Sequence, residues 1–274
     1  MSLFQPFEPD DGNGRRRLRP LPQVPIRSVL PSLVTLVAIC AGLTSIRMTI
    51  EHRFDLAVLL IAVAAALDGI DGRIARFLKS TSRFGAELDS IADFVNFGVA
   101  PAILLYVWGL DDVRSLGWIA MLIYVICAAL RLARFNISIG TTSEKPDWHA
   151  GFFVGVPAPA GAMIVMLPLY LEYFVVPRGS YTAPFVILYA IVVGLLMVSR
   201  LPTWSGKLVG RKVARELVAP MFVFGVLVVA LLLSFPWPTL SILTLTYLAC
   251  LPLSWRSYQL YAVAAARTKG GDTA

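Results

Sequence analysis

The chain has 274 residues, of which 57% are hydrophobic and 15% are charged, with a formal net charge of +7 and a mean hydropathy of +0.73. Because soluble globular domains carry about 25% charged residues, this composition excludes an ordinary soluble enzyme and indicates a polytopic, all-α membrane protein. Cys40, Cys127 and Cys250 stand alone without Cys-x-x-Cys spacing, so neither a disulfide framework nor a thiolate metal site is indicated.

Residues 1–28 precede the first long apolar run and contain Asp10, Asp11 and the cluster Arg15–Arg17 among prolines and glycines. This is not the pattern of a signal peptide, and we expect a mostly disordered, basic cytoplasmic tail. The rest of the chain is expected to form one transmembrane domain over 29–262, followed by a short cytoplasmic tail over 263–274.

The apolar runs predict about eight transmembrane helices. The division between the last two depends on Phe235-Pro-Trp-Pro238, where two prolines favour a turn over a continuous helix. The eight predicted spans are 30–50, 55–76, 86–109, 115–135, 157–176, 183–200, 217–235 and 238–260.

The basic residues test this arrangement of spans. If the N-terminus is cytoplasmic, twenty of the 24 lysines and arginines fall on cytoplasmic segments, and only Arg47, Arg53, Arg114 and Arg178 fall outside. Such a bias agrees with the positive-inside rule, so both termini are expected to be cytoplasmic. The net charge then needs no nucleic-acid partner, because anionic lipid headgroups attract basic inner loops. The basic stretch 200–216 is either such a loop or an interfacial segment.

Four aspartates lie at the ends of two neighbouring apolar runs. Asp68 and Asp71 are three residues apart and share one helix face, and Asp89 and Asp93 are four apart and share another. The short connection between the two runs makes the helices antiparallel neighbours, so the two pairs are expected to face each other. Four carboxylates that converge in this way repel one another unless cations lie between them.

Oxygen ligands without histidine or cysteine suit Mg²⁺ or Mn²⁺, and two such ions about 3.5–4 Å apart form a recurring device for displacement at phosphorus. Gly72 permits a close approach of a ligand, and Arg76 is placed to clamp a phosphate. The alternative is that Arg73, Arg76 and Arg83 neutralise the acids as ion pairs. A second alternative is a cation transporter that uses the same acids as its ion site.

Residues 68–93 match the pattern Asp-x-x-Asp-Gly-x-x-Ala-Arg-x8-Gly-x-x-x-Asp-x-x-x-Asp at every fixed position. This pattern resembles the signature of the CDP-alcohol phosphotransferase family, membrane enzymes that join an alcohol to a phosphoryl group from a CDP-linked donor. The resemblance implies that Asp68 and Asp89 bridge two metals, that Asp71 ligates the first, and that Asp93 touches the second and acts as the base. The implied donor-binding residues are Ser32, Thr35, Gly72, Ala75, Arg76, Ser82 and Gly85. At Ser32 the family usually has Asn.

Three further segments, residues 84–102, 131–136 and 153–161, resemble the serine-specific branch of this family. That branch transfers a phosphatidyl group from CDP-diacylglycerol to L-serine and releases CMP. Arg131 and Arg134 would hold the acceptor carboxylate, and Asn136 its ammonium or hydroxyl group; alternatively, the arginines are anchors that reach toward the membrane surface. Glycerol 3-phosphate, inositol phosphate and choline remain alternative acceptors. The resemblance also implies a homodimer in the inner cell membrane with its site at the cytoplasmic face.

Overall fold

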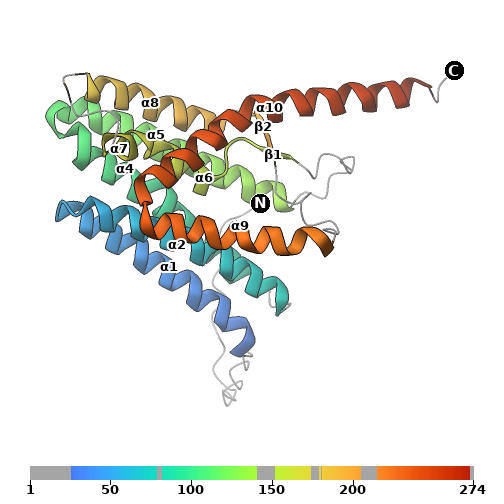
Figure 1. Cartoon of the computed structure of the whole chain (residues 1–274), viewed down its shortest axis with the longest axis horizontal. Coiled ribbons are helices and arrows are strands. Elements are labelled where there is room, and N and C mark those ends of the chain that lie inside the picture. Colours follow the sequence, from blue (N-terminus) through green and yellow to red (C-terminus); the bar gives the residue numbers. More distant parts are fainter. Residues whose placement is uncertain are drawn as a thin grey trace, which may run out of the picture.

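The computed structural model describes residues 26–78, 82–140, 152–173, 179, 181–204 and 215–271 (Figure 1). The predicted N-terminal tail therefore lies almost wholly outside the described residues. The elements are α1 Ile26–Ile50, α2 Phe54–Phe77, α3 Arg83–Asp93, η1 Phe94–Val99, α4 Ala100–Leu105, η2 Tyr106–Leu110, η3 Asp111–Val113, α5 Arg114–Gly140, β1 Phe152–Val154, α6 Ala158–Val165, α7 Leu167–Glu172, α8 Thr182–Val198, β2 Pro202–Trp204, α9 Arg215–Ser234 and α10 Pro236–Gly271.

The described chain is almost entirely helical, and many of its large apolar side chains are exposed on the outside. Four helical segments are long and apolar enough to cross a membrane: Leu30–Ile50, Phe84–Leu110, Arg114–Ile137 and Pro236–Leu260. Three shorter apolar segments accompany them: Ala158–Glu172, Thr182–Val198 and Ala219–Ser234. The protein is therefore an all-α integral membrane protein, as the composition predicts. The number of eight spans and their orientation stay predictions.

The first two helices form an antiparallel pair that stays in contact along its length (Figure 1). They are joined by a tight turn in which His52 adopts a left-handed conformation, with φ 57°. Ser45 on α1 donates a hydrogen bond across the pair to the Ala57 carbonyl, at 2.8 Å. This pairing places the end of α2, which carries Asp68 and Asp71, next to the first half of α1.

Residues 83–110 form one helical rod that two π-helical segments, η1 and η2, interrupt. The first of these begins at Phe94, directly after Asp93. A π-turn leaves backbone groups without their usual partners, and the Tyr124 hydroxyl on α5 donates to the Phe97 carbonyl at 2.8 Å. This hydrogen bond holds the rod against α5 about one turn after Asp93.

The fifth predicted span begins irregularly, as its glycine and prolines indicate. β1 pairs with β2 in an antiparallel two-stranded sheet, and the sequence analysis did not predict either strand. Gly155 follows β1 with φ +80°, where a Cβ atom would lie 2.5 Å from the Met197 carbonyl oxygen, and α6 then starts at Ala158. This turn fixes the start of α6 against the end of α8.

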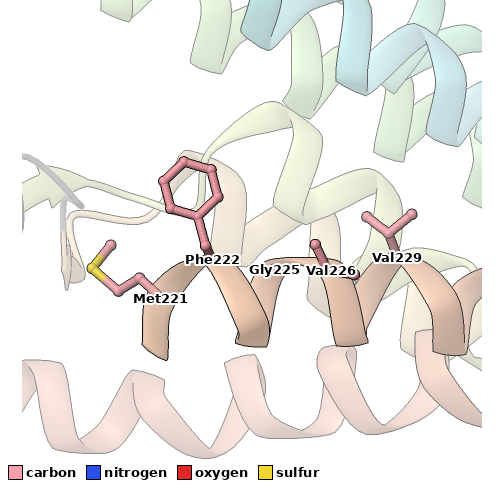
Figure 2. Close-up of a pocket in the computed structure, with 5 residues that line it drawn as sticks. All are labelled: Met221, Phe222, Gly225, Val226 and Val229. Atoms are coloured by element: carbon pink, nitrogen blue, oxygen red, sulfur yellow. The ribbon is translucent and has the colours of Figure 1, made fainter. Parts of the chain in front are cut away.

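The last two helices are separated at Phe235, so the break that the two prolines predict is confirmed. α10 packs on α7 and β2 and then extends beyond the other helices, through residue 262 to Gly271 (Figure 1). α9 is exposed around most of its circumference, and along one side it borders an open apolar hollow of about 460 Å³ (Figure 2). The residues lining this hollow are Met221, Phe222, Gly225, Val226 and Val229.

Candidate active site

Three carboxylates meet where α2 ends and α3 begins. One oxygen each from Asp68, Asp71 and Asp89 lies within 4.8 Å of the other two. The arrangement follows from the helical spacing: the last turns of α2 present Asp68 and Asp71, and the first turns of α3 present Asp89. The carboxylates of the two predicted pairs thus lie close together, as the sequence predicts. We call this end of the bundle the α2–α3 end.

Asp93 completes the cluster one turn deeper along the rod. Its side chain lies beside Asp68, and the Arg131 guanidinium from α5 is near enough to interact electrostatically with both. The Asp93 Oδ1 atom is buried and has no hydrogen-bond partner among the described residues. Four acids and one nearby arginine leave this region with an excess of negative charge.

Thr35 connects the cluster to α1. Its buried hydroxyl lies 2.7 Å from Asp71 Oδ2 and 3.1 Å from the Pro31 carbonyl oxygen. A hydroxyl that donates to Asp71 orients this carboxylate from α1. Thr35 is expected from the sequence to contact the CDP-linked donor, and this role stays a prediction beside the observed contact with Asp71.

Ser32, Ser82 and Gly85 lie together at the start of α3. Ser82 caps this helix by accepting a hydrogen bond from the Gly85 backbone N–H at 2.9 Å. A Cβ atom placed on Gly85 would lie 3.1 Å from Ser82 Oγ and 3.7 Å from Ser32 Oγ. Since the start of a helix favours negative charge, two hydroxyls at this position suit a phosphate group.

Gly72 and Arg76 are exposed on α2, and Ala75 is half-buried there. A Cβ atom on Gly72 would meet nothing within 4 Å, so the backbone is open to an approaching group. Arg76 donates from Nε to the Gly72 carbonyl at 3.0 Å. The Arg76 side chain therefore lies along α2 beside Gly72, and it forms no salt bridge with the four aspartates.

The alternative of internal ion pairing finds little support. Among the described side chains, the salt bridge within 4.0 Å joins Arg47 and Glu51, and none joins Arg73 or Arg76 to the four aspartates. The side chain of Arg83 lies outside the described residues. The described part of the chain thus brings the acids together without neutralising them.

The predicted acceptor residues divide into two groups. Arg131 lies beside the acids, as described above, with its guanidinium carbon 5.3 Å from the centre of the Phe135 ring. Arg134 donates to the Val198 carbonyl at the end of α8, at 2.6 Å. Asn136 donates to the Ser90 hydroxyl at 2.9 Å, next to Asp89. Of these three residues, Arg131 is the one whose guanidinium lies near the carboxylates.

Two residues near the cluster were not predicted from the sequence to belong to the site. Asn96 follows Asp93 by three residues and is 1% exposed, with neither side-chain amide atom hydrogen-bonded among the described residues. A polar residue within an apolar run directly after the motif was a signal that could have found it. Tyr247 on α10 lies near Arg131, and no local pattern in the sequence marks it.

The cluster can hold divalent cations. Its donor atoms are carboxylate oxygens alone, and they lie within the reach of a shared ion. Among the described side chains Arg131 lies near Asp68 and Asp93, but no salt bridge within 4.0 Å neutralises the acids. Hard ions such as Mg²⁺ and Mn²⁺ prefer this donor set. Beside the cluster, the start of α3 offers hydroxyls and backbone N–H groups to a phosphate. α2 offers Arg76 next to the open backbone at Gly72.

Comparisons with known proteins agree with this geometry. Residues 28–198 match the family model described as CDP-alcohol phosphatidyltransferase, and residues 216–252 match a second, described as CDP-alcohol phosphatidyltransferase 2. The chain is 42% identical over 231 residues to the CDP-diacylglycerol–serine O-phosphatidyltransferase of Mycobacterium leprae, covering 82% of this chain and 74% of that one. For the protein of the same name from Mycobacterium tuberculosis, the identity is 38% over 237 residues, with coverages of 85% and 80%. For that from Methanocaldococcus jannaschii, it is 38% over 178 residues, with coverages of 64% and 74%.

Proposed function

Because the chain belongs to the CDP-alcohol phosphatidyltransferase family, we propose that it transfers the phosphatidyl group of CDP-diacylglycerol to the hydroxyl of L-serine. The products are phosphatidylserine and CMP. The observation that carries the proposal is the convergence of Asp68, Asp71 and Asp89 within 4.8 Å, beside a phosphate-compatible helix start. The choice of serine follows the names of the relatives.

The aspartates would hold two divalent cations, Mg²⁺ or Mn²⁺. Asp68 and Asp89, whose carboxylates lie close together, would hold both ions, Asp71 would hold the first, and Asp93 the second. When bound, such ions neutralise a diphosphate and polarise the phosphorus under attack. Thr35 orients Asp71 for this task through the 2.7 Å contact.

The donor's diphosphate would lie along α2 and the start of α3. Ser32, Ser82 and Gly85 offer hydroxyl and backbone contacts, while Gly72 and Ala75 leave room for the nucleotide. Arg76 would exchange its bond to the Gly72 carbonyl for the phosphate, because a charged acceptor binds a guanidinium more strongly. The acyl chains would remain in the lipid around the bundle.

Asp93 would remove the proton from the acceptor hydroxyl, which attacks the phosphorus that bears diacylglycerol. The bond from that phosphorus to the CMP oxygen breaks, so that no protein nucleophile is needed. Arg131, near Asp93 and Asp68, is placed to bind the acceptor carboxylate. Arg134 and Asn136 would complete the acceptor site only if they leave their contacts with Val198 and Ser90.

The setting of this chemistry is a further part of the proposal. We expect eight spans with both termini in the cytoplasm, so that the α2–α3 end meets water-soluble serine at the cytoplasmic face of the inner cell membrane. The excess of lysine and arginine on the inner segments supports this orientation. We also expect a homodimer.

The test is CMP release by the purified full-length protein with CDP-diacylglycerol and one alcohol at a time: L-serine, glycerol 3-phosphate, inositol phosphate or choline. We expect release with L-serine and Mg²⁺ or Mn²⁺, and none after chelation. Release with another alcohol alone would correct the acceptor. Metal flux into sealed vesicles without any CDP-alcohol, together with no CMP release, would favour a transporter instead.

A further inference from the structure

Asn96 is a buried polar side chain that no described residue satisfies by a hydrogen bond. It lies in η1 with 1% of its surface exposed, and neither Oδ1 nor Nδ2 has a hydrogen-bond partner among the described residues. Burying an amide without a partner is costly, and within a membrane no bulk water compensates it. A residue kept under such conditions needs a physical reason.

The packing of α1 holds Asn96 in this position. A Cβ atom on Gly42 would lie 1.9 Å from Asn96 Oδ1 and 3.0 Å from its Cγ atom, so only glycine leaves room for the amide. Gly42 lies seven residues after Thr35, on the same face of α1. The helix that orients Asp71 therefore also confines Asn96.

Asn96 follows Asp93 within about one turn of the rod. Asp89 and Asp93 are four residues apart in α3 and share one helix face, and Asn96 follows Asp93 by three residues in η1. The π-turn that begins at Phe94 separates Asp93 from Asn96, and such turns recur at functional sites. The two residues are three positions apart along the rod, and their side chains are not hydrogen-bonded to each other in this structure.

Asp93 and Asn96 have complementary hydrogen-bonding groups. Asp93 Oδ1 is a buried acceptor without a partner, and Asn96 Nδ2 is a buried donor without one. We propose that Asn96 is the positioning residue of Asp93: with substrates bound, its amide donates to Asp93 Oδ1 and leaves the other carboxylate oxygen free for the acceptor. This inference rests on the proposed role of Asp93 as the base.

The test compares Asn96→Ala with Asn96→Ser, which differ by one hydroxyl and so form a matched pair without and with a donor. Removing a group that orients a functional side chain typically lowers activity by about 10–100-fold. We expect Asn96→Ala to lower kcat in CMP release by that factor while the KM values for CDP-diacylglycerol and L-serine stay within twofold. Asn96→Ser should recover a substantial part of kcat.

A second comparison separates this role from folding. In Gly42→Ala/Asn96→Ala the new methyl group occupies the space that the amide leaves, so this variant should be at least as stable as Asn96→Ala. Its kcat should nevertheless remain as low. If Asn96→Ala does not fold, this double variant takes its place in the comparison with Asn96→Ser.

Three results would overturn the inference: a kcat of Asn96→Ala within threefold of wild type, equal loss in Asn96→Ser and Asn96→Ala, or a raised KM for L-serine with kcat retained. The last would place Asn96 on the acceptor and not on Asp93. An inactive wild type would instead contradict the proposed function, so the two failures are distinguishable.

Discussion

The acidic residues at the two ends of α2 have different kinds of neighbours. At its start, which we call the α1–α2 end, Asp55 accepts a hydrogen bond from the Tyr173 hydroxyl, and close by Glu172 accepts one from the Trp108 indole N–H. At the α2–α3 end, Asp68 and Asp71 face other carboxylates. Thirteen residues of helix, about 20 Å, separate Asp55 from Asp68.

This difference distinguishes an acid that joins helices through hydrogen bonds from an acid that is available to bind a ligand. The α1–α2 end uses neutral aromatic donors, and the Tyr173 ring stacks on Trp237 with 4.0 Å between centres. Its contacts join α2, η2, α7 and α10. The acids at the α2–α3 end, by contrast, lie beside other acids whose ionised forms repel one another, and a bound cation would turn this repulsion into attraction.

The largest effect should come from Asp93. Asn at this position keeps the shape but cannot accept the proton, and the loss of a general base lowers turnover by about 10²–10⁴-fold. We expect CMP release by Asp93→Asn to fall by this factor while CDP-diacylglycerol still raises its melting temperature. Asp55→Asn, at the other end of α2, serves as the control and should keep its turnover within about twofold, because its contacts are structural. Wild-type turnover by a folded, donor-binding Asp93→Asn would remove Asp93 from the mechanism.

Metal binding should separate the two ends next. An ion that binds only the folded protein stabilises it by about 2.7 kcal/mol at a hundred times its Kd. Thermal unfolding with increasing Mg²⁺ or Mn²⁺ should therefore show stabilisation of the wild type and of Asp55→Asn, and little or none for Asp89→Asn. Equal stabilisation of all three proteins would show that the ions bind elsewhere.

Thr35 offers a smaller and more specific test of the α2–α3 end. Thr35→Val keeps the shape and removes the hydroxyl that lies 2.7 Å from Asp71 Oδ2, whereas Thr35→Ser keeps a donor. Losing a hydrogen bond to a charged group costs about 1.5 kcal/mol or more, which corresponds to roughly tenfold in activity. If Thr35 acts through Asp71, the valine variant needs more Mg²⁺ for half-maximal activity. A raised KM for CDP-diacylglycerol at unchanged Mg²⁺ dependence would assign Thr35 to the donor instead.

The cluster could be predicted from the sequence because its geometry is local. Spacings of three and four residues and a short connection are enough to bring Asp68, Asp71, Asp89 and Asp93 together, since helices repeat regularly. The break at Phe235 is local in the same sense, because Pro236 and Pro238 lack the backbone N–H groups that a helix continuing from α9 would need, whereas proline is tolerated in the first turn of a new helix. These features need no knowledge of how the remaining helices pack.

The contacts that refine the cluster could not be predicted, because they join distant parts of the chain. Thr35 and Asp71 are 36 residues apart, and Gly42 touches Asn96 across two different helices. The strand pairing of Phe152 with Trp204 is equally distant. The place of Tyr247 beside Arg131 depends on how α10 crosses the bundle, which periodicity does not encode.

The smallest expected effect belongs to the α1–α2 end and completes the comparison. Tyr173→Phe removes the hydroxyl that donates to Asp55 but keeps the ring that stacks on Trp237. Because both partners are exposed, the free energy of unfolding should fall by at most about 1 kcal/mol. CMP release measured at the same temperature should not change, since the contact lies about 20 Å from the acids at the other end of α2. A loss of turnover without a loss of stability would mean that the two ends are coupled, and the distinction between a structural and a ligand-binding end would no longer hold.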